Sequence, residues 1–337
     1  MFTTPTVLLP PAQKTGRLNI RTGAMVREVT TDENGLCTGV TYVDTATGRY
    51  EHVKARVVVL AASACESARI LLNSRSSRFP NGLANGSGRV GRELTDTTGS
   101  RVRGYIPALE NLPPFNEDGT GNAHLYMPWW ADNRKLDFPR GYHIEFGGGR
   151  GMPGFGFGGR IDKLQGGGYG KKLKDDYRRY YGAMVGFSGR GEMIPNEDSY
   201  CDLDPKAVDQ WGIPVLRFHW KWSETEILQV KHQQETFRSI IEAMGGQALD
   251  PMPTREEDYG ISKGGEIIHE VGTTRMGESP RTSVLNQWSQ AHEVKNLFVA
   301  DGGPFTTNAD KNVTWTILAL SMRTSRHIAE ERKKGNL

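Results

Sequence analysis

A histidine and an asparagine far apart in the sequence are the best candidates for chemistry. His269 begins the segment HEVGTTRMG, and Asn312 opens a predicted helix over residues 312–334. A neutral imidazole titrates near physiological pH and can accept a proton from a hydroxyl group. An asparagine amide cannot titrate, but it can hydrogen-bond the same hydroxyl and fix its orientation. The plainer alternatives are an ordinary surface or core histidine and a helix N-cap, a position where asparagine is common.

Other patterns in the chain resemble functional motifs but lack the context that the chemistry needs. Gly154, Gly156 and Gly159 spell G-x-G-x-x-G, yet no buried apolar strand precedes them and no apolar helix follows. The segment GGGYGKK at 166–172 lacks the first glycine and the final Ser or Thr of a phosphate-binding P-loop. The eight histidines and three cysteines show no metal-ligand spacing, so no metal site is expected.

The composition indicates a folded, globular protein. The charge gives no sign of a polyanionic partner such as nucleic acid. The net charge of the 337 residues is only +3, so we expect no nucleic-acid partner. No apolar run approaches the roughly 18 residues that a membrane span requires. The first residues, MFTTPTVLLPPAQ, lack the basic region of a signal peptide, so this form is expected to remain cytoplasmic.

Hydrophobic patterning divides the chain into three blocks. Residues 18–60 read as short strands joined by turns, and a helix is predicted at 64–74. From about residue 100 to 260, aromatic and glycine-rich segments of strand length predict an antiparallel sheet, with two helices at 171–181 and 223–245. The last block returns to the first pattern, with the strand NLFVADG followed by the long helix that Asn312 opens.

These blocks predict an α/β fold for the domain formed by the first and last blocks. With the middle block included, the chain as a whole is expected to be α+β. Residues 1–100 and 264–337 are expected to form one Rossmann-like domain that is incomplete at its N-terminal end. Residues 101–263 are expected to form an inserted substrate-binding domain built on the antiparallel sheet.

Three segments, taken in order, resemble the glucose-methanol-choline (GMC) oxidoreductases, a family of FAD-dependent enzymes. They are VVVLAASACESARILLNS at 57–74, NGLANGSGRVGRELTD at 81–96, and the long segment 269–323 that contains GTTRMG, TSV, NLFVADG and NVTWT. The likeness covers most of the chain and is greatest to the sugar-oxidising branch, which includes glucoside 3-dehydrogenases and pyranose oxidases. Members of that branch pair a histidine with an asparagine.

The resemblance implies FAD-dependent oxidation of a sugar or other alcohol hydroxyl to a carbonyl. The hydride would pass to flavin N5, with His269 as the base and Asn312 orienting the hydroxyl. Contacts to the adenosine half of FAD are implied for Val26, Ala61, Ala62 and Ser63, and contacts to the flavin for Asp301, Gly302, Val313 and Thr314. A helix N-terminus at the last two positions would suit the negative edge of a reduced flavin.

The sequence departs from the family at three places. Ser63 stands where relatives usually have glycine, and Thr95-Asp96-Thr97 stands where they often read Met-Asp-His. Relatives also begin with a strand–helix unit that carries G-x-G-x-x-G for the FAD pyrophosphate, and no such unit precedes residue 18.

Three interpretations follow from this last departure. The chain is an incomplete part of the enzyme, one subunit of a split enzyme that pairs with a complementary N-terminal segment, or a remnant without catalysis that binds glycans. The expected partners are a sugar or alcohol substrate and an electron acceptor such as oxygen, a quinone or a cytochrome. Six aromatic residues of the middle block could stack on a sugar ring, although core packing is the commoner fate: Trp129, Trp130, Phe155, Phe157, Trp220 and Trp222.

Overall fold

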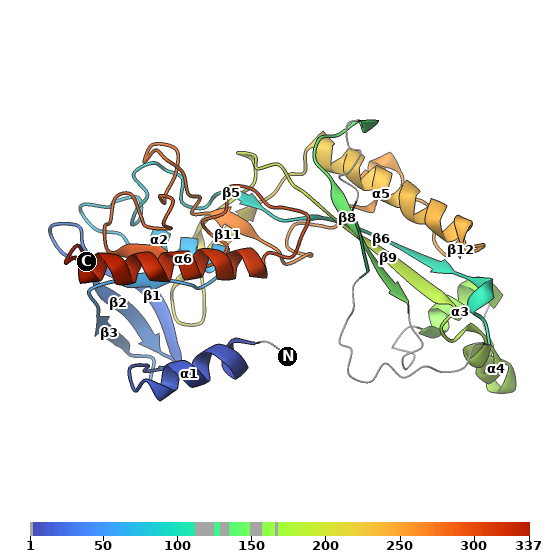
Figure 1. The fold of residues 1–337 in the computed structure, drawn as a ribbon, viewed down its shortest axis with the longest axis horizontal. Coiled ribbons are helices and arrows are strands. Elements are labelled where there is room, and N and C mark those ends of the chain that lie inside the picture. Colours follow the sequence, from blue (N-terminus) through green and yellow to red (C-terminus); the bar gives the residue numbers. More distant parts are fainter. Residues whose placement is uncertain (1–2, 112–124, 129–134, 149–156, 166–167) are drawn as a thin grey trace.

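The computed structural model describes residues 3–111, 125–128, 135–148, 157–165 and 168–337 of the chain. It has two lobes joined by a narrower region (Figure 1). One lobe is built from the two ends of the chain and contains the long C-terminal helix α6. The other lobe is built from the middle of the chain around a single antiparallel sheet.

Alternating strands and polar turns build the sheet at the start of the first lobe. Strands β1 (Ala24–Thr31), β2 (Cys37–Asp44) and β3 (Tyr50–Lys54) pair in antiparallel order. The carboxylate of Asp32 accepts the Leu36 N–H at 2.9 Å in the first turn, and Asp44 accepts the N–H of Thr47 at 2.9 Å in the second. Short aspartate-capped turns thus join these strands, as the sequence predicts.

A short parallel pair brings the first and last blocks of the chain into one sheet. Strand β4 (Val58–Leu60) runs beside β14 (Leu297–Val299), with Val58 opposite Leu297. Helix α2 (Ala64–Asn73) follows β4 and buries Ala68, Ile70, Leu71 and Leu72 in the same apolar core, as its pattern predicts. Helix α6 (Thr314–Lys333) crosses this lobe and ends in basic residues, which suits the helix dipole.

The second lobe is a five-stranded antiparallel sheet with one helix-covered face, which confirms the predicted sheet. Its strands are, in spatial order, β12 (Gln247–Ala248), β6 (Thr98–Tyr105), β9 (Met184–Gly191), β8 (Tyr142–Gly148) and β7 (Leu125–Pro128). Helix α5 (Glu224–Ala243) packs against it through Phe237 and Ile241, and Glu226 accepts the Ser223 N–H at 2.8 Å in a capping box. Helix α4 (Gly170–Tyr180) also forms where it is predicted.

Two further strand pairs connect the lobes. Strand β5 (Arg92–Thr95) pairs with β13 (Val271–Thr273), and the chain continues from β5 directly into β6 of the other lobe. The hairpin of β10 (Tyr200–Val208) and β11 (Pro214–His219) packs on α2.

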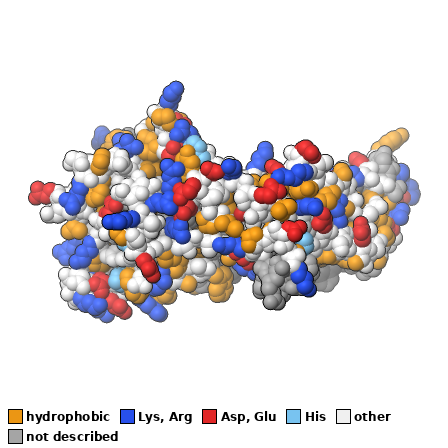
Figure 2. Space-filling view, turned by 90° about the horizontal axis from the view of Figure 1, so that it is seen from above, with side chains coloured by type: hydrophobic (Ala, Val, Ile, Leu, Met, Phe, Trp, Pro, Cys, Tyr) orange, Lys and Arg blue, Asp and Glu red, His pale blue; other side chains and the backbone are white. Residues whose placement is uncertain are grey.

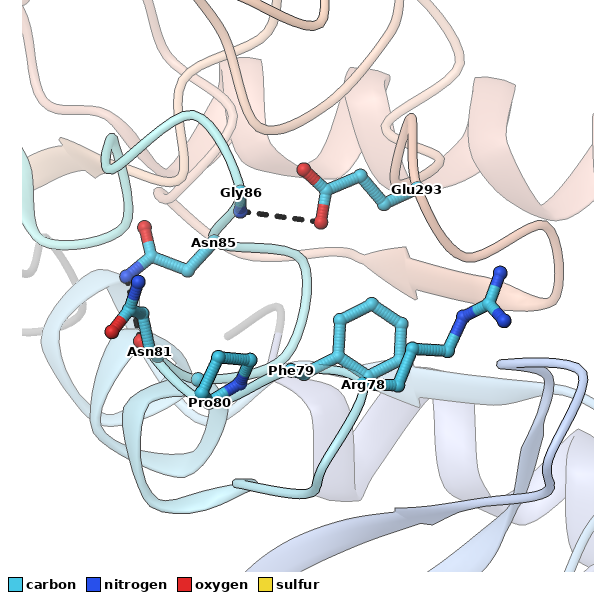
Figure 3. A pocket seen from close by; sticks show the side chains of 8 residues that line it. Arg78, Phe79, Pro80, Asn81, Asn85, Gly86 and Glu293 are labelled. Carbon is cyan, nitrogen blue, oxygen red and sulfur yellow. Dashed lines mark hydrogen bonds between the residues drawn. The ribbon is translucent and has the colours of Figure 1, made fainter.

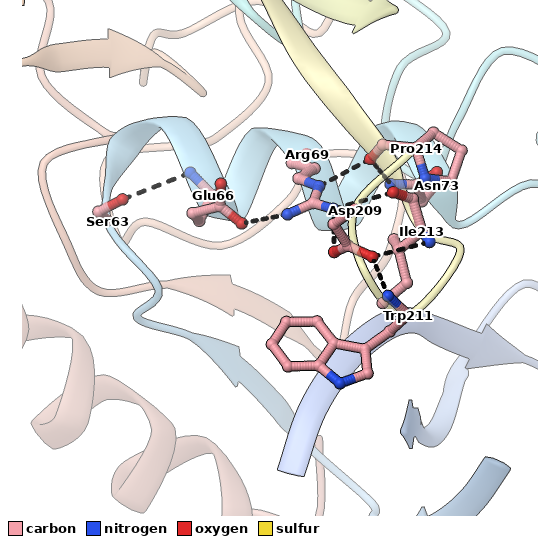
Figure 4. Close-up of polar contacts among 8 residues, drawn as sticks. All are labelled: Ser63, Glu66, Arg69, Asn73, Asp209, Trp211, Ile213 and Pro214. Carbon is pink, nitrogen blue, oxygen red and sulfur yellow. Dashed lines mark hydrogen bonds and ion pairs between the residues drawn. The ribbon is translucent and has the colours of Figure 1, made fainter. Parts of the chain in front are cut away.

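Arg69 of α2 fastens this hairpin. Its buried guanidinium lies 2.7 Å from the Asp209 carboxylate and donates to the Pro214 carbonyl at 2.7 Å (Figure 4). Asp209 in turn accepts the backbone N–H groups of Trp211 and Ile213. These hydrogen bonds offset the cost of taking both charges out of water, and the loss of either partner would leave the other charge buried without compensation.

Some elements were not predicted. A π-helix (Thr4–Leu8) and α1 (Leu9–Lys14) form near the N-terminus, each with proline in its first turn. Helix α3 (Phe157–Gln165), which was not predicted, begins inside the G-x-G-x-x-G pattern, and its sequence FGGRIDKLQ is mixed in polarity. The neighbouring strand β8 is antiparallel, however, and does not supply the parallel strand of a dinucleotide-binding unit. Two short 3₁₀ helices, Pro107–Leu109 and Arg255–Gly260, complete the elements described.

Acidic and basic side chains are interspersed over both lobes on the face that Figure 2 shows. In the part of the chain that the structure describes, no helix is both long and apolar enough to cross a membrane. The described residues also contain no group of three or more His, Cys, Asp or Glu side chains arranged to hold a metal ion.

Candidate active site

His269 lies where the connecting strands meet the sheet of the second lobe. It precedes β13, whose Val271 is paired with Thr95 at the end of β5. The preceding Ile268 has a backbone φ of +61°, which is rare for a β-branched residue, and its side chain is 76% exposed. Strain of this kind is often found at functional sites.

Three side chains hold His269 in place. The Asp96 carboxylate accepts the His269 N–H at 3.1 Å, and the Thr97 hydroxyl lies 3.3 Å from Nδ1 of the ring. From the other side, the Asn308 amide donates to the His269 carbonyl at 2.9 Å. The ring is therefore fixed through Nδ1, which leaves Nε2 as the nitrogen available for a ligand.

Sequence reasoning did not identify Asp96, Thr97 and Asn308 as site residues. One sequence feature did point to this loop, because Thr95-Asp96-Thr97 departs from the family pattern. It marked the loop as unusual without showing that this loop contacts His269, since the two segments are distant in the sequence.

Burial and nearby charge keep His269 neutral. Burial lowers the pKa of its imidazole below the ordinary value, and the positive charge of Arg190 lowers it further. Burial also raises the pKa of Asp96 to about 7. A neutral imidazole that can accept a proton is the form that general-base catalysis requires.

Asn312 lies on the loop that leads into α6. Its side chain is exposed, and the N-cap residue of α6 is Val313, so the alternative that Asn312 is the N-cap was wrong. The same loop is tied to His269 by Asn308, four residues earlier. It is also tied to the second lobe, because Arg140 donates to the Thr307 hydroxyl at 2.9 Å.

The first turn of α6 offers donors for an anionic group. Its N-cap, Val313, makes no side-chain hydrogen bond to the helix, and Thr314 and Trp315 are exposed. Backbone N–H groups of an uncapped helix N-terminus suit a negatively charged ligand edge. In addition, the buried Oδ2 of Asp96 has no hydrogen-bond partner among the described residues. Both observations fit a site that a bound group completes.

Asp301 joins the ends of the two parallel strands. It is buried and accepts the Ser67 hydroxyl at 2.5 Å and the Gly303 N–H at 2.7 Å. Burial raises its pKa, while hydrogen bonds from Ser67, Gly303, Ala62 and Ser63 oppose that rise. Asp301 therefore fastens the loop 61–63 that follows β4.

The glycine after Asp301 is needed for close packing. A Cβ on Gly302 would lie 3.1 Å from the Glu270 carbonyl oxygen and 3.2 Å from the Val271 side chain. Ala61, Ala62 and Gly302 thus lie together at the carboxyl ends of β4 and β14, the place where α/β sheets bind ligands.

Val26 lies farther along the first lobe, on β1. Its backbone precedes a bulge, because Val26 is opposite Tyr42 while Glu28 is opposite Thr41. Its side chain packs against the core that contains α2.

Ser63 adopts a backbone conformation that glycine tolerates best. Its φ of +85° and ψ of 161° fall in a region that is essentially restricted to glycine. The residue also caps α2, since its hydroxyl accepts the Glu66 N–H at 3.4 Å. The departure from the family's usual glycine is therefore a strained one.

We expect Ser63→Gly to stabilise the protein. Relief of backbone strain is worth about 1–3 kcal/mol, and it exceeds the loss of the cap and the added freedom of the unfolded chain, each below about 1 kcal/mol. The net gain of about 1 kcal/mol should be visible in urea unfolding. Ser63→Ala is the matched control, because it removes the cap and keeps the strain, and it should lower stability. A glycine variant that is less stable than the alanine variant contradicts this account.

Of the six aromatic candidates for stacking on a sugar, the side chains of Trp220 and Trp222 lie within the described part of the chain. Trp129, Trp130 and Phe155, and the side chain of Phe157, lie outside the described residues. Trp220 and Trp222 pack edge to face at 5.0 Å, and Trp222 donates to the Ser262 carbonyl at 3.1 Å. These two tryptophans therefore have a packing role.

A cavity of about 480 Å³ lies apart from His269 and Asn312, between the loop after α2 and Glu293 (Figure 3). Phe79 and Pro80 line one side, and Glu293 accepts the Gly86 N–H at 3.2 Å across it. None of the predicted site residues lines this cavity.

Comparison with known proteins agrees with the class of fold described above. Sequence signatures of GMC oxidoreductases match residues 2–98 and 195–321. The 2-methyl-1,2-propanediol dehydrogenase of Mycolicibacterium austroafricanum is 30% identical over 92% of this chain and 54% of its own length. The fructose dehydrogenase large subunit of Gluconobacter japonicus is 27% identical over 96% of this chain and 56% of its own length.

A solved structure gives the same result for the fold. The formate oxidase of Aspergillus oryzae RIB40 superimposes with a TM-score of 0.62 at 17% identity, covering 92% of this chain and 60% of that chain. The α/β prediction with an inserted antiparallel sheet is thereby confirmed.

The chain belongs to the GMC oxidoreductase family. The cofactor of this family is FAD, as the resemblance implied. The chain spans about half the length of the curated relatives that it matches.

Proposed function

We propose that the protein of which this chain is part oxidises a hydroxyl of a sugar or related alcohol to a carbonyl, with FAD as cofactor. The observation that carries the proposal is His269, a neutral imidazole fixed through Nδ1 by Thr97 beside the loop of Asn312. The relatives that act on fructose and on a propanediol, as their names state, support this substrate class.

In the proposed reaction, His269 accepts the hydroxyl proton. When the Nδ1–H donates to the Thr97 hydroxyl, the lone pair remains on Nε2 for the substrate. The Asn312 amide hydrogen-bonds the substrate oxygen and fixes its orientation. Bound FAD supplies the acceptor for the hydride that leaves the carbinol carbon.

The proposed cofactor contacts follow from the geometry of the first lobe. The backbone N–H groups of Val313 and Thr314 would face the negative edge of the flavin. Ala61, Ala62, Ser63 and Gly302 would line the opposite part of the site, and Asp301 would hold their loops in place. The backbone of Val26 would contact the adenosine half.

We further propose that the two parts of the chain bind different molecules. Residues 1–100 and 264–337 bind FAD, and residues 101–263 bind the substrate. The hairpin at 200–219 docks onto the FAD-binding part through Arg69 and Asp209. The sheet face opposite α5, to which Arg190 of β9 belongs, forms the wall of the substrate site.

Two partners are proposed. The first is a complementary N-terminal segment, which would cover Val59 of β4 (45% exposed) and the outer face of α6, where Trp315 is 85% and Met322 56% exposed. The second is an electron acceptor. The fructose dehydrogenase relative is named as a large subunit, which supports the idea of a further subunit.

Anaerobic flavin reduction tests the proposed activity. The protein is loaded with FAD, with and without the N-terminal segment of a relative, and mixed with sugars, glycosides and 1,2-diols. We expect at least one of these alcohols to bleach the flavin, and its deoxy analogue to leave it oxidised. Bound FAD that no alcohol reduces would contradict the proposal. Glycan binding by protein without FAD would favour the alternative of a binding module.

A further inference from the structure

A buried histidine outside the catalytic pair links the second lobe to the loop of Asn312. His143 lies on β8 with 0% of its surface exposed, and pairing with β9 holds its backbone. Its Nε2 is 3.3 Å from the Glu145 carboxylate, and its Nδ1 is 3.4 Å from the Asp310 carboxylate. One imidazole ring therefore spans two carboxylates, one on its own strand and one on the loop before α6.

The two contacts require a charged ring. A carboxylate carries no proton to share, so the ring can present an N–H to both carboxylates only when both ring nitrogens are protonated. Burial lowers the pKa of His143, but the adjacent carboxylates of Asp310 and Glu145 outweigh that effect and raise it. The other charges that face this group are Arg190, which lies 3.4 Å from Glu145, and Lys311, which pairs with Asp310.

Asp310 is two residues before Asn312, on a loop without regular structure. Other contacts also hold this loop, among them the Arg140 guanidinium to Thr307 at 2.9 Å and the Asn308 amide to the His269 carbonyl at 2.9 Å. The contact from His143 reaches the loop at Asp310, two residues before Asn312. It connects the position of Asn312 to a strand that the sheet holds rigid.

We propose that His143 is a positioning residue. As an imidazolium that bridges Glu145 and Asp310, it holds Asn312 where its amide and the His269 imidazole can contact the same substrate hydroxyl. The inference rests on the proposed function, in which Asn312 orients the substrate hydroxyl. A displacement of about 1 Å at a reacting group can slow a reaction by about 100-fold. His143 thus acts on the reaction through Asn312 and does not touch the substrate.

A double-mutant cycle tests the proposal in the FAD-loaded protein. His143→Gln retains a donor but loses the positive charge, and it should lower the rate of flavin reduction by about 10–100-fold. Asn312→Ala should also slow the reaction. When Asn312 is already alanine, His143→Gln should add less than about a threefold further loss, because residues that act as a unit are not additive. His52→Gln, at an exposed histidine of β3, is the matched control and should leave the rate unchanged.

The outcomes separate this inference from the proposed function. If Asn312→Ala does not slow flavin reduction, the role of Asn312 and this inference both fail. If both single variants are slow and their effects multiply, the proposed function stands and the positioning role of His143 is wrong. Asp310→Asn, on the irregular loop, carries the same test if His143→Gln does not fold.

Two measurements do not depend on activity. Nitrogen NMR of the wild-type protein across a pH series should show His143 still mainly doubly protonated at pH 6.5, its ordinary pKa, and a mainly neutral ring at that pH would overturn the proposal. Amide hydrogen exchange at residues 308–313 should become faster in His143→Gln, while exchange in β8 stays slow. Unchanged exchange in that loop would also overturn it.

Discussion

Replacing His269 with alanine should slow flavin reduction by substrate by about 10²–10⁴-fold, the usual effect of losing a general base. The side chain is the neutral imidazole that Asp96, Thr97 and Asn308 hold in place, and none of these three can take over its role at Nε2. Stopped-flow mixing of the FAD-loaded variant with substrate measures the rate directly. His52→Ala, at an exposed histidine, is the matched control and should behave as the wild type. Near-normal reduction in the His269 variant would eliminate this residue as the base.

The pH profile gives the same test without a mutation. His269 acts as a base only when it is deprotonated, so the rate should rise with pH and reach a plateau above the pKa of His269. Burial and the charge of Arg190 place that pKa below the ordinary value of 6.5. The plateau should therefore already be reached at neutral pH, and the rate should fall only in acid. A rate that increases mainly above pH 7 would indicate a different base.

The second large effect is expected in cofactor binding. The 337 residues expressed alone should bind FAD about 10²–10⁴-fold more weakly than the same residues together with the N-terminal segment of a relative. The reason is that the family's G-x-G-x-x-G motif donates hydrogen bonds to the pyrophosphate, each worth about 1.5–3 kcal/mol to a charged group. The adenosine and flavin contacts touch other parts of FAD and cannot replace them. Protein-bound flavin absorbance, with and without the co-expressed segment, measures the difference.

A surface variant tests whether the N-terminal segment docks on the exposed face of α6. Trp315→Glu places a charge on the exposed face of α6 and should prevent the segment from docking. Arg326→Glu, farther along the same helix at another exposed position, is the control. Equal complementation of both variants would show that the segment docks elsewhere. A yellow, soluble protein from the 337 residues alone would contradict the prediction itself.

The sequence predicted those elements whose signals are local. Helix α5 has a capping box and an apolar stripe, and both lie within a few residues of each other. The pairing of β4 with β14 was also accessible, because buried apolar strands of α/β folds associate in parallel. The N-terminal helices were missed because proline-rich segments read as irregular unless proline falls in a first turn. Helix α3 was missed because its start is rich in glycine.

The immediate surroundings of the proposed base could not be predicted for a different reason. The contact between Thr97 and His269, and the pair of Arg69 with Asp209, join segments far apart in the sequence. Each partner is an ordinary polar residue in its own segment. Thr97 reaches the imidazole because β5 and β13 pair between the lobes, and no local sequence pattern encodes that pairing.

The parallel pair of β4 and β14 also determines the order in which the protein can fold. Its strands are separated in the sequence by the whole middle block, so β4 can pair with β14 only after residues 297–299 have been made. All strands of the middle sheet, and α5 that covers it, come from residues 98–248, so this sheet can form before β14 is made. Closing the long loop between β4 and β14 is then the slow, high-contact-order step of folding. The β4–β14 pair, with the loop 61–63 that follows β4, is therefore expected to become native after the middle sheet.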